Sequence, residues 1–174
     1  RLGLHGRPYV AYLGGLEPRK NVPALITGWA AAVSDRPDPP ALVLAGGSGW
    51  SEEVDEAVAS VPAHLRLVRP GYLRFSDLPG YLGGALVVAF PSRGEGFGLP
   101  VLEAMACAAP VLTTHRASLP EVGGDAVAYT EPDADSIQAA LRALLDDPVR
   151  REALGAAGHA RAQEFTWAAS AEAH

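Results

Sequence analysis

Residues 86–114 read "LVVAFPSRGEGFGLPVLEAMACAAPVLTT" and carry the pattern that decides the fold class. The apolar runs at 86–90 and 111–114 have the length and composition of buried strands. Between them a glycine-rich loop leads into an alanine-rich stretch at 100–107, with Pro100 suited to the first turn of a helix. A helix that joins two such apolar strands predicts a parallel pair covered on both faces.

The same alternation of strand and helix extends through the whole chain. Further strands are predicted at 9–14, 41–46, 65–68 and 126–130, and further helices at 22–34, 51–60, 77–83, 134–146 and 149–164. Asn21, Ser51 and Ser76 are predicted N-caps, and Ser118 with Glu121 has the spacing of a capping box on a short helix. This order predicts an α/β fold with a Rossmann-like, doubly wound parallel sheet of about six strands.

Composition limits the classes of partner. With 174 residues, 48% hydrophobic and 20% charged, the chain is expected to form one domain with its own core. Its net charge of −6 argues against a nucleic-acid or anionic-membrane surface. The single cysteine, Cys107, cannot form an internal disulfide, and we see neither a signal peptide nor a membrane-spanning run. A cytoplasmic setting is therefore expected.

In open α/β sheets ligands collect at the carboxyl ends of the strands, so the loops there are the first candidates for a site. The loop after the first strand, "GGLEPRKN" (14–21), contains Gly15, Arg19 and Lys20, which is the only lysine of the chain. Glycine lets the backbone approach a ligand, and adjacent cations suit a diphosphate. A solvated basic turn is the open alternative.

The loop after the second strand, "AGGSGW" (45–50), resembles part of a dinucleotide fingerprint. The fingerprint belongs after the first strand, however, and its third glycine position is occupied here by Glu52. We therefore predict a structural turn and no NAD site; a flexible turn that lines the cleft is the open alternative.

The loop at 95–99 combines an anion site with carboxylates. Free N–H groups on Gly98 and Leu99, together with the positive end of the helix dipole, favour a phosphate, and Gly96 lets it approach. A carboxylate is a pure acceptor and suits a vicinal diol, so Glu103 is predicted to bind ribose and Glu95 a hexose. A charge that complements the helix dipole and an exposed loop acid are the alternatives for these two glutamates.

No metal or cofactor is expected. "DAD" (133–135) has the spacing of a metal-binding Asp-x-Asp, but it stands where a helix cap is predicted. The five histidines do not cluster at ligand spacing.

The motifs also resemble a known family. "EGFGLPVLEAMACAAPVLTT" (95–114) is similar to the Glu-(seven residues)-Glu signature of the retaining, nucleotide-sugar-dependent glycosyltransferases of GT-B architecture, the group 1 family. "GGLEPRKN" resembles the first donor-domain loop of that family, and "SLPEVGGDAVAYTEPD" (118–133) resembles the stretch after its fifth strand. The resemblance covers nearly the whole chain. It implies one half of a GT-B architecture, the C-terminal, donor-binding domain.

The family resemblance also implies a role for each site residue. Arg19 and Lys20 would clamp the diphosphate, and Glu103 would hold the ribose. Glu95 and the backbone of 96–99 would hold the transferred sugar and its phosphate, and the base would pack near 69–73. The substrate-binding set is thus Gly15, Arg19, Lys20, Tyr72, Leu73, Glu95, Gly96, Phe97, Gly98, Leu99 and Glu103, with Arg19, Lys20 and Glu95 as the catalytic candidates.

The implied reaction is transfer of a hexose with retention of configuration, in which fixed cations and backbone donors stabilise the departing diphosphate. The "SLPEV" and "GDA" segments resemble those of mannosyltransferases, and this resemblance favours GDP-mannose over a UDP-hexose as donor. A non-catalytic nucleotide-binding or interaction domain is one alternative. A glycoside hydrolase, which needs two facing carboxylates, is another.

The implied acceptor site lies on an N-terminal domain that this chain lacks. We therefore expect a nucleotide-sugar-binding domain at 1–165, the start of a truncated helix at 166–174, and no transfer by this chain alone. Peripheral membrane contact is expected only through the missing domain.

Overall fold

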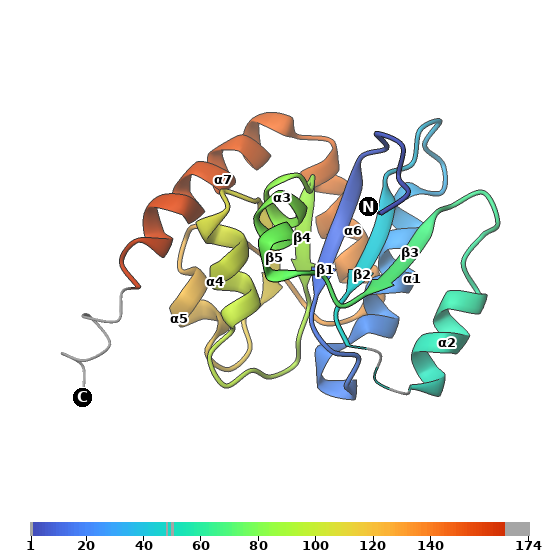
Figure 1. Cartoon of the computed structure of the whole chain (residues 1–174), viewed down its shortest axis with the longest axis horizontal. Coiled ribbons are helices and arrows are strands. Elements are labelled where there is room, and N and C mark those ends of the chain that lie inside the picture. The colour runs from blue at the N-terminus through green and yellow to red at the C-terminus, as the bar shows by residue number, and fades with distance from the viewer. Residues whose placement is uncertain (1, 48, 50, 166–174) are drawn as a thin grey trace.

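The computed structural model describes residues 2–47, 49 and 51–165 (Figure 1). Within these residues a six-stranded sheet has the order β3-β2-β1-β4-β5-β6, and every neighbouring pair is parallel. The strands are β1 (Tyr9–Leu13), β2 (Ala41–Ala45), β3 (Leu67–Gly71), β4 (Val87–Phe90), β5 (Val111–Thr114) and β6 (Ala128–Thr130). The predicted Rossmann-like, doubly wound sheet is confirmed.

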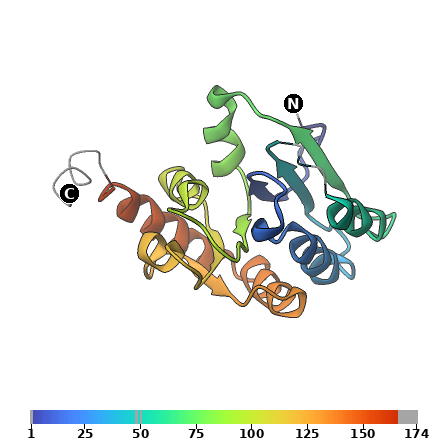
Figure 2. The ribbon, with the colours of Figure 1, turned by 90° about the horizontal axis from the view of Figure 1, so that it is seen from below.

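Helices cover both faces of the sheet. They are α1 (Val22–Val33), α2 (Glu52–Ala59), α3 (Leu78–Gly83), α4 (Leu99–Ala106), α5 (Leu119–Gly123), α6 (Ala134–Leu145) and α7 (Pro148–Ala162), with 3₁₀ turns η1 (Pro18–Lys20) and η2 (Phe75–Asp77). Helix α1 packs against α6 and α2, whereas α4 packs against α7, α5 and α3. Figure 2 shows α1 and α6 on one side of the strands and α3 and α4 on the other. The strands between these two layers are therefore largely apolar, as in other buried parallel sheets.

The core lies on both faces of the sheet, and its largest side chains include Trp29, Tyr12 and Phe90. Trp29 donates through Nε1 to the carbonyl of Pro40 at 3.1 Å. The hydroxyl of buried Tyr81 donates to the carbonyl of Tyr12 at 2.7 Å. Because these polar tips have partners, the large rings are buried without an unpaired donor.

The third strand differs from its prediction. It was expected at 65–68, but β3 runs from Leu67 to Gly71 and includes Pro70. Proline lacks the N–H that a central strand needs, and β3 is the edge strand of the sheet, where proline is tolerated. The pairing with β2 shifts register here, and the strand ends at Gly71 with φ +77°.

The predicted helix starts are only partly correct. Ser51 accepts from the N–H of Val54 and caps α2, and Asp133 accepts from the N–H of Ser136 and caps α6. The prediction for Ser76 is wrong, because Ser76 lies inside η2 and α3 begins after Asp77 with no side-chain cap.

Two other predicted caps are used for tertiary contacts. Asn21 precedes α1, but it has a left-handed backbone and makes no side-chain cap. Its amide donates instead to the carbonyls of Pro91 and Pro132. Ser118 forms no capping box either, and its hydroxyl donates to the carbonyl of Glu95. Both side chains thus tie separate loops together.

In the part of the chain that the structure describes, no helix has the length and apolar character needed to cross a bilayer. The helix start predicted at 166–174 lies outside the described residues.

Candidate functional site

The strand order locates the crevice where a site is expected. Strand β1 leads to β2 on one side, and its other neighbour β4 leads to β5 on the opposite side. This reversal opens a crevice at the carboxyl ends of β1 and β4, the usual ligand site of doubly wound sheets. The loops at 14–21 and 91–98 follow these two strands. Two cavities of about 540 and 760 Å³ are lined by residues 2–9 and lie at the amino ends of the strands, away from both loops.

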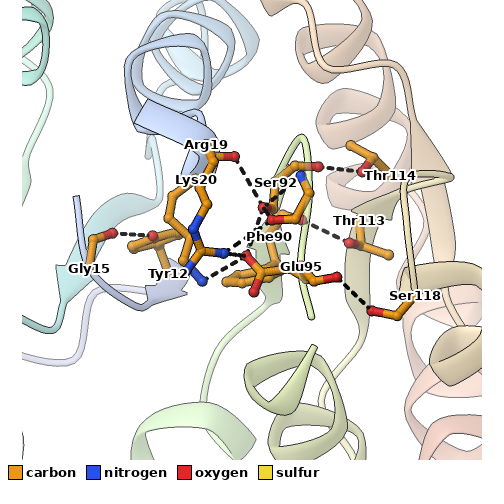
Figure 3. Close-up of polar contacts among 11 residues, drawn as sticks. Tyr12, Gly15, Arg19, Lys20, Phe90, Ser92, Glu95, Thr113, Thr114 and Ser118 are labelled. Atoms are coloured by element: carbon orange, nitrogen blue, oxygen red, sulfur yellow. Dashed lines mark hydrogen bonds and ion pairs between the residues drawn. The ribbon is translucent and has the colours of Figure 1, made fainter. Parts of the chain in front are cut away.

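The two loops meet in a cluster of ion pairs around Glu95 (Figure 3). Lys20 Nζ lies 2.7 Å from Glu95 Oε1, and these side chains are only 8% and 7% exposed. Arg19 Nη1 lies 3.1 Å from the same oxygen, and its side chain is 52% exposed. The hydroxyl of Ser92 donates to that oxygen at 2.8 Å. Three donors thus converge on Oε1.

The second carboxylate oxygen of Glu95 is arranged differently. Among residues 2–47, 49 and 51–165, no side chain or N–H group donates to Oε2. Glu95 is therefore anchored through one oxygen and presents the other as an acceptor beside the crevice.

The cluster keeps Glu95 ionised. Burial raises the pKa of its carboxyl, but the hydrogen bonds from Lys20 and Ser92, the charge of Lys20 and the bond from Arg19 outweigh burial and lower the pKa below its ordinary value. One carboxylate beside two cations leaves this group of three residues with a net positive charge of one. The pair at 19–20 is thus partly neutralised from within, which the sequence did not indicate.

Lys20 is buried because several groups compensate its charge. Its ammonium faces Glu95 and lies 4.9 Å from the centroid of the Phe90 ring. A cation over an aromatic face is favourable, most of all where water is excluded. Lys20 is therefore a fixed internal charge, whereas Arg19 is the cation that solvent or a ligand can reach.

The start of α4 presents unused backbone donors. Gly98 precedes the helix with φ +93°, and a Cβ there would lie 2.9 Å from Leu119 Cδ2. Within the described chain, the N–H groups of residues 96–99 have no acceptor. A Cβ at Gly96 would meet nothing within 4 Å, so no described neighbour requires glycine there. These N–H groups and the positive end of the helix dipole are thus available to an anion, and the anion site itself stays a prediction.

Glu103 lies on α4, one turn beyond Leu99, and its residue surface is exposed. Partial burial of its carboxyl nevertheless raises its pKa. No described residue forms a hydrogen bond or ion pair with its carboxylate, whereas its backbone carbonyl accepts from the N–H of Cys107. Its two oxygens are free to accept.

The remaining predicted binding residues differ in how far they are exposed. Tyr72, Phe97 and Leu99 are exposed apolar side chains, and Leu73 packs partly against the core. The carbonyl of Gly15 accepts from the hydroxyl of Tyr12. These positions agree with a binding role and do not test it.

A cavity of about 230 Å³ lies at the carboxyl ends of β1, β2 and β3, and its lining includes Arg69, Gly46 and Gly47. Tyr72 lies beside it, because a Cβ on Gly47 would come within 2.5 Å of the Tyr72 hydroxyl. The glycine loop after β2, predicted to be a structural turn with a cleft-lining role as the alternative, thus borders this cavity. In the described residues no three His, Cys, Asp or Glu side chains gather in a metal-binding group.

Sequence reasoning missed the polar residues that support the cluster. Ser92 and Thr114 were given no role, and Asn21 and Ser118 were assigned to helix caps. Thr114 donates to the carbonyl of Ser92 at 2.6 Å from the neighbouring strand. The contacts of Asn21, Thr114 and Ser118 join residues more than 20 positions apart, so no local spacing indicates them, whereas Ser92 lies only three positions before Glu95.

The chain is similar to proteins of known type. The family model "Glycosyl transferases group 1" matches residues 7–147. Over 161 residues the chain is 37% identical to O-antigen chain mannosyltransferase B of Escherichia coli, covering 91% of this chain and 42% of that protein. Over 171 residues it is 34% identical to the GDP-mannose-dependent monoacylated alpha-(1-6)-phosphatidylinositol monomannoside mannosyltransferase of Corynebacterium glutamicum, covering 92% and 44%.

Among solved structures, Anabaena Alr3699/HepE in complex with UDP-glucose has a TM-score of 0.80 at 21% identity, covering 94% of this chain and 46% of that chain. At this identity the likeness shows the fold alone. The chain spans less than half the length of each of these three proteins.

Proposed function

The chain belongs to the group 1 glycosyl transferases and corresponds to a C-terminal domain of their GT-B architecture. From this premise we propose that it binds a nucleoside-diphosphate sugar, which is the donor in the transfer of a hexose. The acceptor is bound by another domain of the whole enzyme. Transfer retains the configuration of the sugar and needs no metal. A cytoplasmic setting remains part of this proposal.

The observation that carries the proposal is the one-sided anchoring of Glu95. Its Oε1 is held by Lys20, Arg19 and Ser92, while Oε2 has no described donor. A fixed carboxylate oxygen suits a sugar hydroxyl, because the acceptor is already oriented and little order has to be gained on binding.

The diphosphate is proposed to lie between Arg19 and the start of α4. Arg19 is half-exposed and can turn toward a phosphate, while Lys20 and Ser92 continue to hold Glu95. The unused N–H groups of 96–99 face the same anion. Charge that develops on the departing diphosphate would thus meet a guanidinium, backbone donors and the nearby field of Lys20.

The nucleoside part is proposed to lie toward the other end of the crevice. Glu103 accepts from the ribose hydroxyls, and the base occupies the 230 Å³ cavity next to Tyr72. One relative is named as GDP-mannose-dependent and another as a mannosyltransferase, which supports GDP-mannose as donor. The structural neighbour holds UDP-glucose, so a UDP-hexose is the competing donor.

Isothermal titration calorimetry of the 174-residue chain with GDP-mannose, UDP-glucose, GDP, UDP and guanosine tests the proposal. We expect binding of the diphosphates and their sugars, with GDP-mannose preferred. Arg19→Ala should weaken GDP binding about 10- to 100-fold, the equivalent of losing a hydrogen bond to a charged group, and leave guanosine unchanged.

Arg116→Ala is the control, because Arg116 is a half-exposed arginine that pairs with Glu131. If none of the five ligands binds, the proposal is contradicted. Robust sugar transfer by this chain alone would contradict the assignment of the acceptor to another domain.

A further inference from the structure

Three hydroxyl groups on the β5 side hold the loop that carries Glu95 (Figure 3). Thr113 donates to the carbonyl of Phe90 at 2.8 Å, and Thr114 donates to the carbonyl of Ser92 at 2.6 Å. Ser118, in the loop after β5, donates to the carbonyl of Glu95 at 3.1 Å. Three carbonyls of the segment from 90 to 95 are thus held from the β5 side, whereas those of Pro91 and Gly94 accept from Asn21 and Arg19.

These bonds continue beyond the end of the backbone ladder. The last paired residues of β4 and β5 are Phe90 and Thr113. Past this pair no backbone bond joins the described residues 91–98 to β5. The side-chain hydroxyls of Thr114 and Ser118 therefore replace the ladder where the loop turns toward the crevice.

The local structure at Ser118 serves this tertiary contact. Ala117, just before it, has φ +50°, a left-handed conformation that is unfavourable for a residue with a Cβ. Ser118 itself is helical and gives no cap to α5, although Glu121 completes the capping-box spacing. Its hydroxyl is directed to the Glu95 carbonyl instead.

The next residue supports the far end of the same loop. Leu119 is fully buried, and its Cδ2 lies where a Cβ on Gly98 would approach to 2.9 Å. Ser118 therefore holds the loop at Glu95 while Leu119 contacts it at Gly98. The unused N–H groups of 96–98 lie between these two supports.

We propose that Ser118 is a positioning residue for the donor site, an inference that rests on the proposed function. The carboxylate of Glu95 is fixed at Oε1, and Ser118 fixes its backbone. The contacts at the carboxylate and at the backbone carbonyl of Glu95 are both needed to orient Oε2 toward the sugar and the following N–H groups toward its phosphate. Ser118 acts only through this loop and touches no ligand.

The test compares Ser118→Ala, Ser118→Thr and wild type in the 174-residue chain. Calorimetry gives the affinities for GDP-mannose and GDP, or for UDP-glucose and UDP if wild type prefers that pair. We expect Ser118→Ala to lower the affinity for the nucleotide sugar about 3- to 10-fold, the effect of one neutral hydrogen bond, and that for the diphosphate less than about 2-fold. Ser118→Thr, which keeps the hydroxyl, should restore the wild-type ratio of the two affinities.

Ser60→Ala is the matched control, because Ser60 directly follows α2 and its hydroxyl donates to the carbonyl of Glu56 in that helix. It should leave both affinities unchanged. If wild type binds both ligands and Ser118→Ala has the same ratio of the two affinities, the role of Ser118 is overturned and the proposed function stands. An equal loss of affinity for both ligands, or a Ser118→Thr variant that does not restore the wild-type ratio, would also overturn that role. If wild type binds no nucleotide sugar, the proposed function and this inference both fail.

Discussion

Replacing Lys20 with methionine removes the positive charge that faces Glu95 and keeps an unbranched apolar stem. Glu95, only 7% exposed, would then rely on Ser92 and the half-exposed Arg19. Breaking a buried pair costs about 3–5 kcal/mol. The two remaining hydrogen bonds, each contributing about 1 kcal/mol, reduce this, so we expect a loss of about 1–3 kcal/mol in the free energy of unfolding. For a chain of this size the melting temperature would fall by about 2–12 °C.

The loss should depend on pH with a defined sign. In wild type the pKa of Glu95 lies below its unfolded value of 4.5, so the pair stabilises the fold above that pH and loses this effect as the pH falls through the lower folded value. In Lys20→Met the bond and the charge of Lys20 no longer lower the pKa of Glu95, so its folded pKa should rise. The ionised carboxylate then stabilises the fold less at neutral pH than in wild type, and this deficit disappears as the pH falls and the carboxyl is protonated in both proteins. The difference between wild type and variant should therefore shrink in acid.

Urea denaturation at about pH 7 and about pH 4 measures both effects through the linear dependence of unfolding free energy on denaturant. Arg116→Met is the control, because the Arg116–Glu131 pair has a similar distance of 3.0 Å but side chains 51% and 66% exposed. It should cost about 0–1 kcal/mol. Equal losses for the two variants at neutral pH, or a Lys20→Met loss that persists undiminished in acid, would refute the assignment of a buried, charge-stabilised pair.

Three further predictions concern the glutamates and the loop glycines. Glu103→Ala should weaken the binding of nucleoside diphosphates and of nucleotide sugars to the same extent. In calorimetry a 2′,3′-dideoxy analogue should bind wild type and variant equally. A loss of affinity for the nucleotide sugar alone would contradict the ribose role. Glu95→Gln should weaken nucleotide-sugar binding about 10-fold or more, as expected for the loss of a charged acceptor, and should affect diphosphate binding less. If Glu103→Ala changes the two affinities in the same way, the assignment of different ligand groups to the two glutamates is refuted. Gly98→Ala should destabilise the fold by about 1–3 kcal/mol in thermal unfolding, because φ is +93° and the Cβ would meet Leu119, whereas Gly96→Ala, with open space around it, should be nearly neutral without ligand.

Most of the fold could be predicted from the sequence because its elements repeat a local pattern. The strands β1, β2, β4 and β5 lie within one residue of their predicted ranges, since each is a short apolar run bounded by glycine, proline or polar residues. β3 was placed too early, because Pro70 argues locally against a strand and only its edge position makes proline acceptable.

The site was predicted as a set of loops and not as a set of contacts. Both the 14–21 and the 91–98 loops were identified from their glycines and charges. That Lys20 and Arg19 converge on one oxygen of Glu95 was not foreseen, because it needs β4 to lie beside β1 although the residues are about 75 positions apart. The neutralisation of a cation by Glu95 is thus a consequence of strand order.

The sequence by itself determined the alternation of strands and helices, the loops that follow each strand and the residue types available there, since these depend on interactions between near neighbours. The tertiary structure alone decided which side chains meet. Asn21 and Ser118 illustrate the difference: each has the local pattern of a helix cap, yet each bonds to carbonyls of other loops. A hydroxyl or amide bonds to the acceptor that packing brings within reach, and packing is a property of the whole chain.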